Sequence, residues 1–224
     1  VGQGESILIR TPDGQNILVD SGPDPASACI QLGNKLPFWD RQIDMLILTQ
    51  LQSDHIAGSL ELLKRYHIGS LGIPPSSSSA VLPREIVETA TIKRVALSTL
   101  VHGKQLDTGS DVRLTVLNPP PEPFKGTDDD ANNNSIVIRV SYGKVSFLLC
   151  SDIGMEAERY LADNRAGLQS DVLKVAHHGS EGSSSDEFLA IVNPASAVIS
   201  AGAVNRFGHP NKESLERLLN KVQR

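Results

Sequence analysis

Asp54 and His55 stand at a turn between a predicted strand and a predicted helix. The apolar run at residues 45–48 is typical of a buried strand, and the amphipathic run at 59–66 is typical of a helix. A carboxylate and an imidazole in this position can bind a metal ion or transfer protons. Because loops on a rigid scaffold commonly carry function, we expect chemistry at this turn.

The same arrangement recurs later in the chain. Asp152 follows the apolar strand predicted at 145–150, His177 and His178 follow the strand at 172–176, and His209 follows the strand at 197–200. Adjacent residues of a strand point to opposite sides, so we expect only one of His177 and His178 to be a ligand. The sequence leaves open which one it is. For Asp152, an N-cap of the helix predicted from residue 155 is the competing interpretation.

These residues together form a mixed set of imidazole and carboxylate groups. Asp54, His55, Asp152 and one of His177 and His178 suit Zn²⁺, Mn²⁺ or iron, and would be an unusual set for Ca²⁺ or Mg²⁺. We therefore expect a divalent metal, Zn²⁺ or Mn²⁺, as the cofactor. Each residue alone is a weak signal, and the prediction depends on their recurrence at successive strand ends.

The whole chain sets the limits within which such a site must be built. Its 224 residues, 39% of them hydrophobic, can bury a substantial core, and no apolar run approaches the ~20 residues of a membrane helix. The net charge of −5 argues against binding nucleic acid by electrostatics alone, although bound metal ions would add local positive charge. Cys29 and Cys150 are far apart and are expected to be reduced thiols.

The order of the predicted elements indicates the fold class. A hairpin at 6–20 and another at 135–150 are each followed by alternating strands and helices. This order predicts an α/β (α+β) protein with two mixed β-sheets face to face and helices outside, a four-layer αββα sandwich. We expect residues 1–224 to form a single domain. Because the chain opens inside a strand-like motif without an initiator Met, we expect it to be excised from a longer, membrane-anchored protein.

Several motifs, in order, resemble the metallo-β-lactamase superfamily, and within it the hydrolase-like domain of ComEC-type DNA-internalisation (competence) proteins. Residues 1–6 (VGQGES) resemble the family's opening motif, and 19–22 (VDSG) resemble its first metal-loop motif. Residues 50–55 (QLQSDH) stand in place of His-x-His-x-Asp-His. The series is completed by residues 132–138, 150–153, 176–180 and 208–210. The resemblance implies the metallo-β-lactamase fold, in agreement with the predicted sandwich.

The resemblance also implies roles for individual residues. In the family pattern two histidines hold a first metal ion, and here Gln50 and Gln52 occupy those degenerate positions. An amide is a poorer ligand than imidazole for Zn²⁺, so we expect one occupied site per chain. The remaining implied roles are these: metal ligands Asp54, His55, Asp152 and His177; catalytic residues Asp20, Asp54, His178 and His209, with Asp20 orienting the metal loop; substrate-binding residues Asn133, Ser135 and Ser180.

The function implied by the resemblance is metal-dependent phosphodiester hydrolysis. Single-stranded DNA would be the substrate, with the strand that is not transported degraded during natural transformation. The implied partner is the membrane channel portion of the same polypeptide, and the implied location is a soluble domain of a bacterial inner-membrane protein. Which side of the membrane it faces is left open.

Two alternatives compete with this prediction. A degenerate domain that binds DNA or a partner without cleaving it is favoured by Gln50 and Gln52, and is opposed by the retained Asp54, His55 and Asp152. A stand-alone metallo-hydrolase of a small ester or phosphodiester is the other. With 4% aromatic residues and no basic stretch interleaved with aromatic residues, composition does not by itself indicate DNA.

Overall fold

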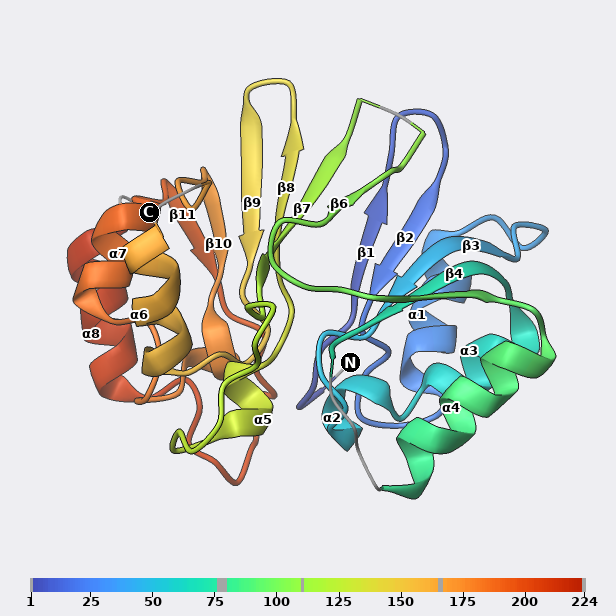
Figure 1. Ribbon diagram of the computed structural model, residues 1–224, viewed down its shortest axis with the longest axis horizontal. Helices are drawn as coiled ribbons and strands as arrows, with labels where there is room; N and C mark the ends of the chain where they lie inside the picture. Colours follow the sequence, from blue (N-terminus) through green and yellow to red (C-terminus); the bar gives the residue numbers. More distant parts are fainter. Residues whose placement is uncertain (1, 76–79, 110, 165–166, 223–224) are drawn as a thin grey trace. The chain divides into compact units, whose positions relative to one another are not determined.

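The computed structural model describes residues 2–75, 80–109, 111–164 and 167–222 of the chain. The chain forms two compact units, Val1–Thr99 and Leu100–Arg224, called here the N-terminal and C-terminal units. Each unit is one β-sheet with helices packed beside it (Figure 1). Among the described residues, no helix is long and apolar enough to cross a bilayer.

The N-terminal unit has a five-stranded sheet in the order β1-β2-β3-β4-β5. Strands β1 and β2 form an antiparallel hairpin, and β2 to β5 are parallel. Because parallel neighbours need a crossover, a helix separates each pair of successive strands from β2 onward. The elements are β1 (Ile7–Arg10), β2 (Asn16–Val19), α1 (Ser27–Lys35), β3 (Gln42–Ile47), α2 (Ser53–Ile56), α3 (Ser59–Arg65), β4 (His67–Ile73), α4 (Val81–Ile92) and β5 (Ala96–Thr99).

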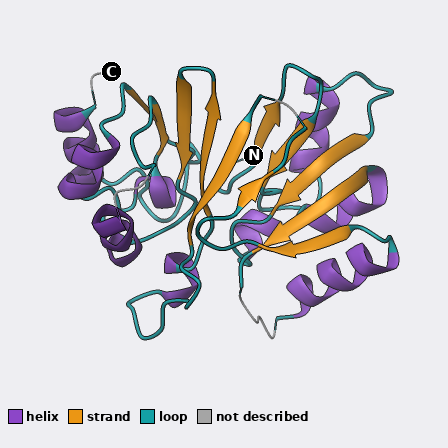
Figure 2. Ribbon diagram, turned by 45° about the horizontal axis from the view of Figure 1, so that its top comes forward, coloured by secondary structure: helices purple, strands orange, loops and turns teal. Residues whose placement is uncertain are grey.

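The core of this unit lies between the sheet and its helices. Leu46 and Leu71 from the sheet pack with Leu32 of α1, Leu62 of α3 and Ile86 of α4, all of them buried. Figure 2 shows these helices beside the strands of the sheet. This packing holds the carboxyl ends of β2 and β3 side by side, with Val19 opposite Ile47.

The C-terminal unit has a six-stranded sheet in the order β11-β10-β9-β8-β7-β6. Strands β6 to β9 are antiparallel, while β9, β10 and β11 are parallel. The elements are β6 (Gln105–Leu106), β7 (Arg113–Asn118), α5 (Asp130–Asn133), β8 (Val137–Tyr142), β9 (Val145–Leu149), α6 (Met155–Asn164), β10 (Val172–Lys174), the 3₁₀ helix η1 (Ala176–Gly179), α7 (Asp186–Val192), β11 (Ser196–Val198) and α8 (Lys212–Lys221).

The core of the C-terminal unit is built around Phe188 of α7. Phe188 packs in one buried cluster with Leu161 of α6, Leu148 of β9, Leu173 of β10 and Leu218 of α8. The carboxyl ends of the parallel strands β9 and β10 lie next to each other, with Leu149 opposite Lys174. The loops that follow these two strands carry Asp152 and the His177–His178 pair.

The predicted fold class, α/β with two mixed sheets and accompanying helices, is confirmed. Three α-helices of the described residues were not predicted: α1, α5 and the four-residue α2, which covers the turn predicted at Asp54 and His55. Helix α1 carries Ala28 and Leu32 four residues apart on its buried side, but Gly33 and Asn34 weaken its helical signal. Its first backbone N–H, that of Ser27, donates to the Asp24 carboxylate at 2.9 Å. Helix α5 has only four residues, inside a segment predicted to be a loop. The single-domain prediction remains a prediction.

Candidate functional site

The N-terminal unit places His55 against the carboxylate of Asp20. His55 Nδ1 lies 2.7 Å from Asp20 Oδ2, and both side chains are fully buried. Asp20 also accepts hydrogen bonds from the Thr49 backbone N–H, at 2.7 Å, and from the Thr49 hydroxyl, at 2.6 Å. The carboxylate fixes the ring so that Nδ1 carries the proton and Nε2 is the nitrogen that can bind a metal ion.

The backbone around His55 is held as firmly as its ring. The His55 carbonyl accepts hydrogen bonds from the Ser21 N–H, at 2.7 Å, and from the Ser21 hydroxyl, at 3.0 Å. Gly58 lies so close to this turn that a Cβ there would stand 2.3 Å from the Ser21 carbonyl oxygen. The turn from β2 and the start of α3 therefore form one rigid support for His55.

Asp54 lies beside His55 at the start of the same short helix, α2. Asp54 Oδ2 is 3.9 Å from His55 Nε2, and the Asp54 side chain is 35% exposed. Of the two degenerate positions, Gln50 is buried and Gln52 is exposed. The imidazole and carboxylate predicted as one half of the ligand set are thus together, and one of the two glutamines is enclosed in the fold.

Glu5 is a third acidic residue close to His55, after Asp20 and Asp54. Glu5, Asp20 and His55 are all buried, and each places a potential ligand atom within 4.8 Å of the others. The Glu5 N–H donates to the Asp54 carbonyl oxygen at 3.3 Å, and a Cβ on Gly4 would stand 2.5 Å from that oxygen. The opening glycine motif therefore serves close packing against the Asp54–His55 turn.

The C-terminal unit pairs Asp152 with His178. His178 Nε2 lies 3.6 Å from Asp152 Oδ2, and both side chains are almost fully buried. His178 Nδ1 lies 2.6 Å from the carbonyl oxygen of Ser200, so Nδ1 carries the proton and donates it. His178 therefore has the same arrangement as His55, with Nδ1 held by an acceptor and Nε2 directed to a carboxylate. The local pattern left open which of His177 and His178 is a ligand, and the family resemblance implied His177; it is His178 that lies beside Asp152.

The rings of His177 and His209 lie near that of His178, with centroids 6.5 and 6.4 Å from it. The centroids of their rings are 5.6 Å apart, and the ring of His209 stacks on that of Phe207 at 5.7 Å. Burial, followed by the neighbouring His177 and His178, holds the pKa of His209 below its usual range. His209 Nδ1 is buried and has no hydrogen-bond partner among the described residues. The neutral ring of His209 is thus favoured.

Backbone strain is concentrated at these residues. Asp20, Ser151, His177 and His178 all have positive φ, at 59°, 49°, 47° and 53°. Non-glycine residues in this region cost about 1–3 kcal/mol each and persist where the surrounding structure imposes them. Such strain occurs preferentially at functional sites, which supports the interpretation that these turns form the functional site.

The side chain of Asn133, predicted to bind substrate, is engaged in hydrogen bonds within the protein, and its role in substrate binding stays a prediction. Its side-chain oxygen accepts from the Gly154 N–H at 3.0 Å, and its Nδ2 donates to Thr127 Oγ1 and Glu156 Oε2. With its side chain buried and engaged in this way, Asn133 supports the loop that follows Asp152. Ser135 is fully buried as well, whereas Ser180 is partly exposed after η1.

A buried carboxylate supports the loop that follows the histidine pair. Glu158 of α6 accepts hydrogen bonds from the Ser184 N–H and from the Ser185 N–H, the latter at 2.8 Å. The Arg217 guanidinium donates to the carbonyl oxygens of Glu181, Ser183 and Ser184. Burial raises the pKa of Glu158, and the two backbone donors act against that shift.

Sequence reasoning missed Thr49, Glu5, Glu158 and the Ser200 carbonyl. Glu5 lies inside a quoted motif and Thr49 directly precedes one, and a polar residue in such a position is a usable signal when it is expected to be buried. For Glu158 and Ser200 the sequence offers no comparable signal, because their partners come from distant elements.

Comparison with known proteins identifies the family. The family model described as "Metallo-beta-lactamase superfamily" matches residues 1–203. The chain is 32% identical over 235 residues to "ComE operon protein 3" of Bacillus subtilis, and 32% identical over 219 residues to "Competence protein ComA" of Neisseria gonorrhoeae. Each match covers 97% of this chain, but only 30% and 28% of those relatives.

A solved structure supports the fold. The metallo-β-lactamase fold protein YhfI of Bacillus subtilis matches with a TM-score of 0.62 and 12% identity, over 98% of this chain and 86% of that one. At that identity the likeness concerns the fold alone. The predicted family is confirmed: the chain belongs to the metallo-β-lactamase superfamily.

Proposed function

We propose that this chain is a metal-dependent phosphodiesterase domain that acts on single-stranded DNA. The observation that carries the proposal is the matched orientation of two buried histidines. His55 and His178 each present Nδ1 to an oxygen acceptor and Nε2 to a carboxylate. Metal-binding histidines in proteins are held in this way, so the donor set fits a divalent ion.

We assign the ligands Asp54 and His55 in the N-terminal unit, and Asp152 and His178 in the C-terminal unit. This assignment replaces the predicted ligand His177 by His178, because His178 is the one that lies beside Asp152. With Gln50 and Gln52 in place of histidines, we expect about one Zn²⁺ or Mn²⁺ ion per chain.

A bound divalent ion would supply a water nucleophile of lowered pKa and would offset negative charge developing on the phosphate. The protein residues do the remaining work. Asp20 keeps the His55 ring in one tautomer, and the Ser200 carbonyl does the same for His178. His209, with its pKa held low by burial, accepts a proton or relays it to the leaving oxygen together with His177.

An exposed aromatic residue beside His209 supports a nucleic-acid substrate. Phe207 is 55% exposed, its ring stacks on His209, and the guanidinium of Arg206 lies 4.9 Å from the Phe207 ring centroid. Aromatic faces next to an arginine bind single-stranded nucleic acid by stacking and charge attraction. We therefore propose that Phe207 and Arg206 hold a base and a phosphate of the DNA.

A nuclease assay on end-labelled single-stranded DNA with Mn²⁺ or Zn²⁺ tests this proposal. Wild type is expected to cleave, and His55→Ala and Asp152→Ala should each reduce the rate more than 100-fold, since each removes a ligand. His67→Ala, an exposed histidine at the start of β4, is the matched control and should retain full activity. Equal activity of His55→Ala and His67→Ala would contradict the ligand assignment.

Substrate binding can be tested separately from chemistry. Phe207→Ala should raise KM for single-stranded DNA about tenfold with little change in kcat, because base stacking is worth about 1–3 kcal/mol. Val204→Ala, at a 96% exposed residue nearby in the chain, is its control. A change confined to kcat would argue against a role in holding the substrate.

A domain that binds DNA without cleaving it is the second candidate, and the enclosed Gln50 favours it. Measuring bound metal in Gln50→His/Gln52→His decides how far these positions limit the site. If the glutamines are the limitation, the double variant should bind up to two ions and cleave faster than wild type. Gln105→His, at an exposed strand residue, controls for added surface histidine. Metal-independent DNA binding with no cleavage by either protein would favour the binding role.

A further inference from the structure

The N-terminal unit carries an exposed aromatic pair that the proposed catalysis does not use. Phe38 and Trp39 are 80% and 72% exposed, and their rings contact each other edge to face at a centroid distance of 4.8 Å. They lie in the turn between α1 and β3. Large aromatic side chains are rarely left in water by chance as a contiguous pair, so this turn is a candidate contact surface.

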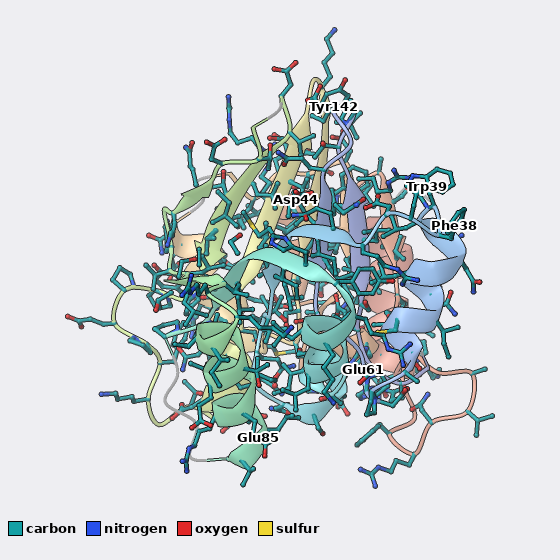
Figure 3. The ribbon with its side chains drawn as sticks, turned by 90° about the vertical axis from the view of Figure 1, so that its right-hand side faces the viewer. Phe38, Trp39, Asp44, Glu61, Glu85 and Tyr142 are labelled. Carbon is teal, nitrogen blue, oxygen red and sulfur yellow. The ribbon has the colours of Figure 1, made fainter. Side chains whose placement is uncertain are left out.

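The turn holds the two rings in place. The Asp40 N–H donates to the Pro37 carbonyl oxygen at 2.9 Å, closing the turn. The Asp40 carboxylate in turn accepts from Asn16 Nδ2 at 3.0 Å and from the Gln42 N–H at 3.2 Å. Because the backbone is fixed at both ends, Phe38 and Trp39 are presented to solvent as a preorganised projection (Figure 3).

Basic residues surround this turn because of the topology. Helices α1, α3 and α4 end, and strands β3, β4 and β5 begin, at the same edge of the parallel sheet. The exposed cations at this edge are Lys35, Arg41, Lys64, Arg65, Lys93 and Arg94. We call these six cations, together with Phe38, Trp39 and the 82% exposed Ile92, the basic edge.

The sign of the charge here is opposite to that of the chain. The whole chain has a net charge of −5, yet cations outnumber the nearby carboxylates Asp40, Asp44 and Glu61. All three carboxylates are engaged within the protein: Asp40 and Asp44 accept hydrogen bonds from Asn16, and Glu61 pairs with Lys64 and Arg65. Lys35, Arg41, Lys93 and Arg94 have no carboxylate partner among these three. Some cations also suit the carbonyl ends of their helices. That explanation does not account for the aromatic pair among them.

The basic edge lies away from the candidate metal ligands of its own unit. Phe38 and Trp39 precede β3, whereas Asp54 and His55 follow it. Strand β3 has six residues, which corresponds to a separation of about 20 Å. In Figure 3 the aromatic pair lies at the opposite end of the unit from Glu85 of α4. A DNA strand held at the ligands would need to run along the whole strand to reach these rings.

We propose that the basic edge docks this domain on an anionic lipid surface. Tryptophan and phenylalanine insert at the level of lipid headgroups, and flanking lysine and arginine residues are attracted to acidic headgroups. The rings of Phe38 and Trp39 provide the inserted part, and the six cations provide the electrostatic part. Docked in this way, the Asp54–His55 end of the sheet faces away from the lipid.

Trp39 is the only tryptophan of the chain and therefore reports directly on this surface. The 224-residue chain is mixed with vesicles of phosphatidylcholine containing phosphatidylglycerol, or of phosphatidylcholine alone. Trp39 fluorescence should shift to the blue and be quenched by brominated lipid with the anionic vesicles only. Raising the salt concentration should reverse binding, because the attraction is screened.

Matched variants distinguish this surface from general charge effects. Lys93→Gln at the basic edge should weaken vesicle binding about fivefold, as expected for one cation near an anionic surface. Arg84→Gln, at the other end of α4, should not change it. Phe38→Ser keeps the fluorescent reporter and should weaken both binding and quenching, while its circular dichroism melting curve verifies folding. Equal effects of Lys93→Gln and Arg84→Gln would contradict the proposal.

Two further outcomes would overturn it. The first is that anionic vesicles leave Trp39 fluorescence unchanged. The second is that a single-stranded oligonucleotide quenches Trp39 while vesicles do not, which would make the basic edge a nucleic-acid surface. Neither outcome depends on nuclease activity, so failure here and failure of the proposed function are distinguishable.

Discussion

His55 Nδ1 lies 2.7 Å from the carboxylate of Asp20, and both side chains are fully buried. The two residues are 35 positions apart in the chain and meet because β2 and β3 are parallel neighbours. Asp20 also binds both the backbone and the hydroxyl of Thr49. One carboxylate therefore sets the tautomer of His55 and joins the ends of two strands.

Asp20→Asn should weaken divalent metal binding about 10–100-fold while the protein remains folded. The reason is that the carboxylate that holds Nδ1 of the metal-binding His55 is replaced by a neutral amide. Calorimetric titration with Zn²⁺ or Mn²⁺ measures the effect. Asp13→Asn, in the exposed turn between β1 and β2, is the control. Unchanged affinity in Asp20→Asn would mean that His55 is not a ligand.

His178 and His177 allow a closely matched comparison. Both have positive φ, and asparagine tolerates that region better than most residues, so His178→Asn and His177→Asn carry similar backbone strain. Bound metal, measured by elemental analysis after gel filtration, should be lost in His178→Asn and retained in His177→Asn. The reverse pattern would restore His177 as the ligand.

Glu158 should make stability depend on pH in a specific direction. Burial raises its pKa in the folded state, so the native protein binds this proton more tightly than the unfolded chain does. The free energy of unfolding should therefore fall as pH rises from the unfolded pKa, about 4.3, through the higher folded pKa, and then stay level. Urea titrations at a series of pH values should show this fall in wild type and a smaller one in Glu158→Gln.

Glu187→Gln serves as the control for that experiment, since Glu187 lies exposed in the first turn of α7. Its pH profile should match that of wild type. A Glu158→Gln profile that also matches wild type would contradict the prediction, because it would mean that folding does not shift the pKa of Glu158.

Substitution by alanine should have opposite effects on stability at Gly58 and at Gly33. A Cβ on Gly58 would stand 2.3 Å from the Ser21 carbonyl oxygen, so Gly58→Ala should destabilise the fold by about 1–3 kcal/mol and weaken metal binding through His55. Gly33 of α1 has open space around it, and Gly33→Ala should stabilise the helix by about 0.5–1 kcal/mol. Thermal unfolding of both variants checks the pair, and destabilisation of similar size in both would contradict the packing argument.

The sequence predicted most strands and helices, as well as the turns that carry Asp54, Asp152 and the histidine pair. These features depend on local apolar periodicity and on glycine-rich turns, which short stretches of sequence display. The ordered motifs also identified the family, which the family match confirms. Helix α1 was missed because Gly33 and Asn34 lower its helical propensity, and its buried side is satisfied only by packing on the sheet.

By itself, therefore, the sequence determined most of the elements, the family and the residue types available for metal binding. Only the tertiary structure decided which residues are partners. It placed Asp20 behind His55, placed His178 rather than His177 beside Asp152, and engaged Asn133 in support of a loop. It also gathered the cations of three helix ends around Phe38 and Trp39. The reason is physical: these contacts join segments tens of residues apart, and the crossovers of parallel strands bring them together in a way that no local pattern records.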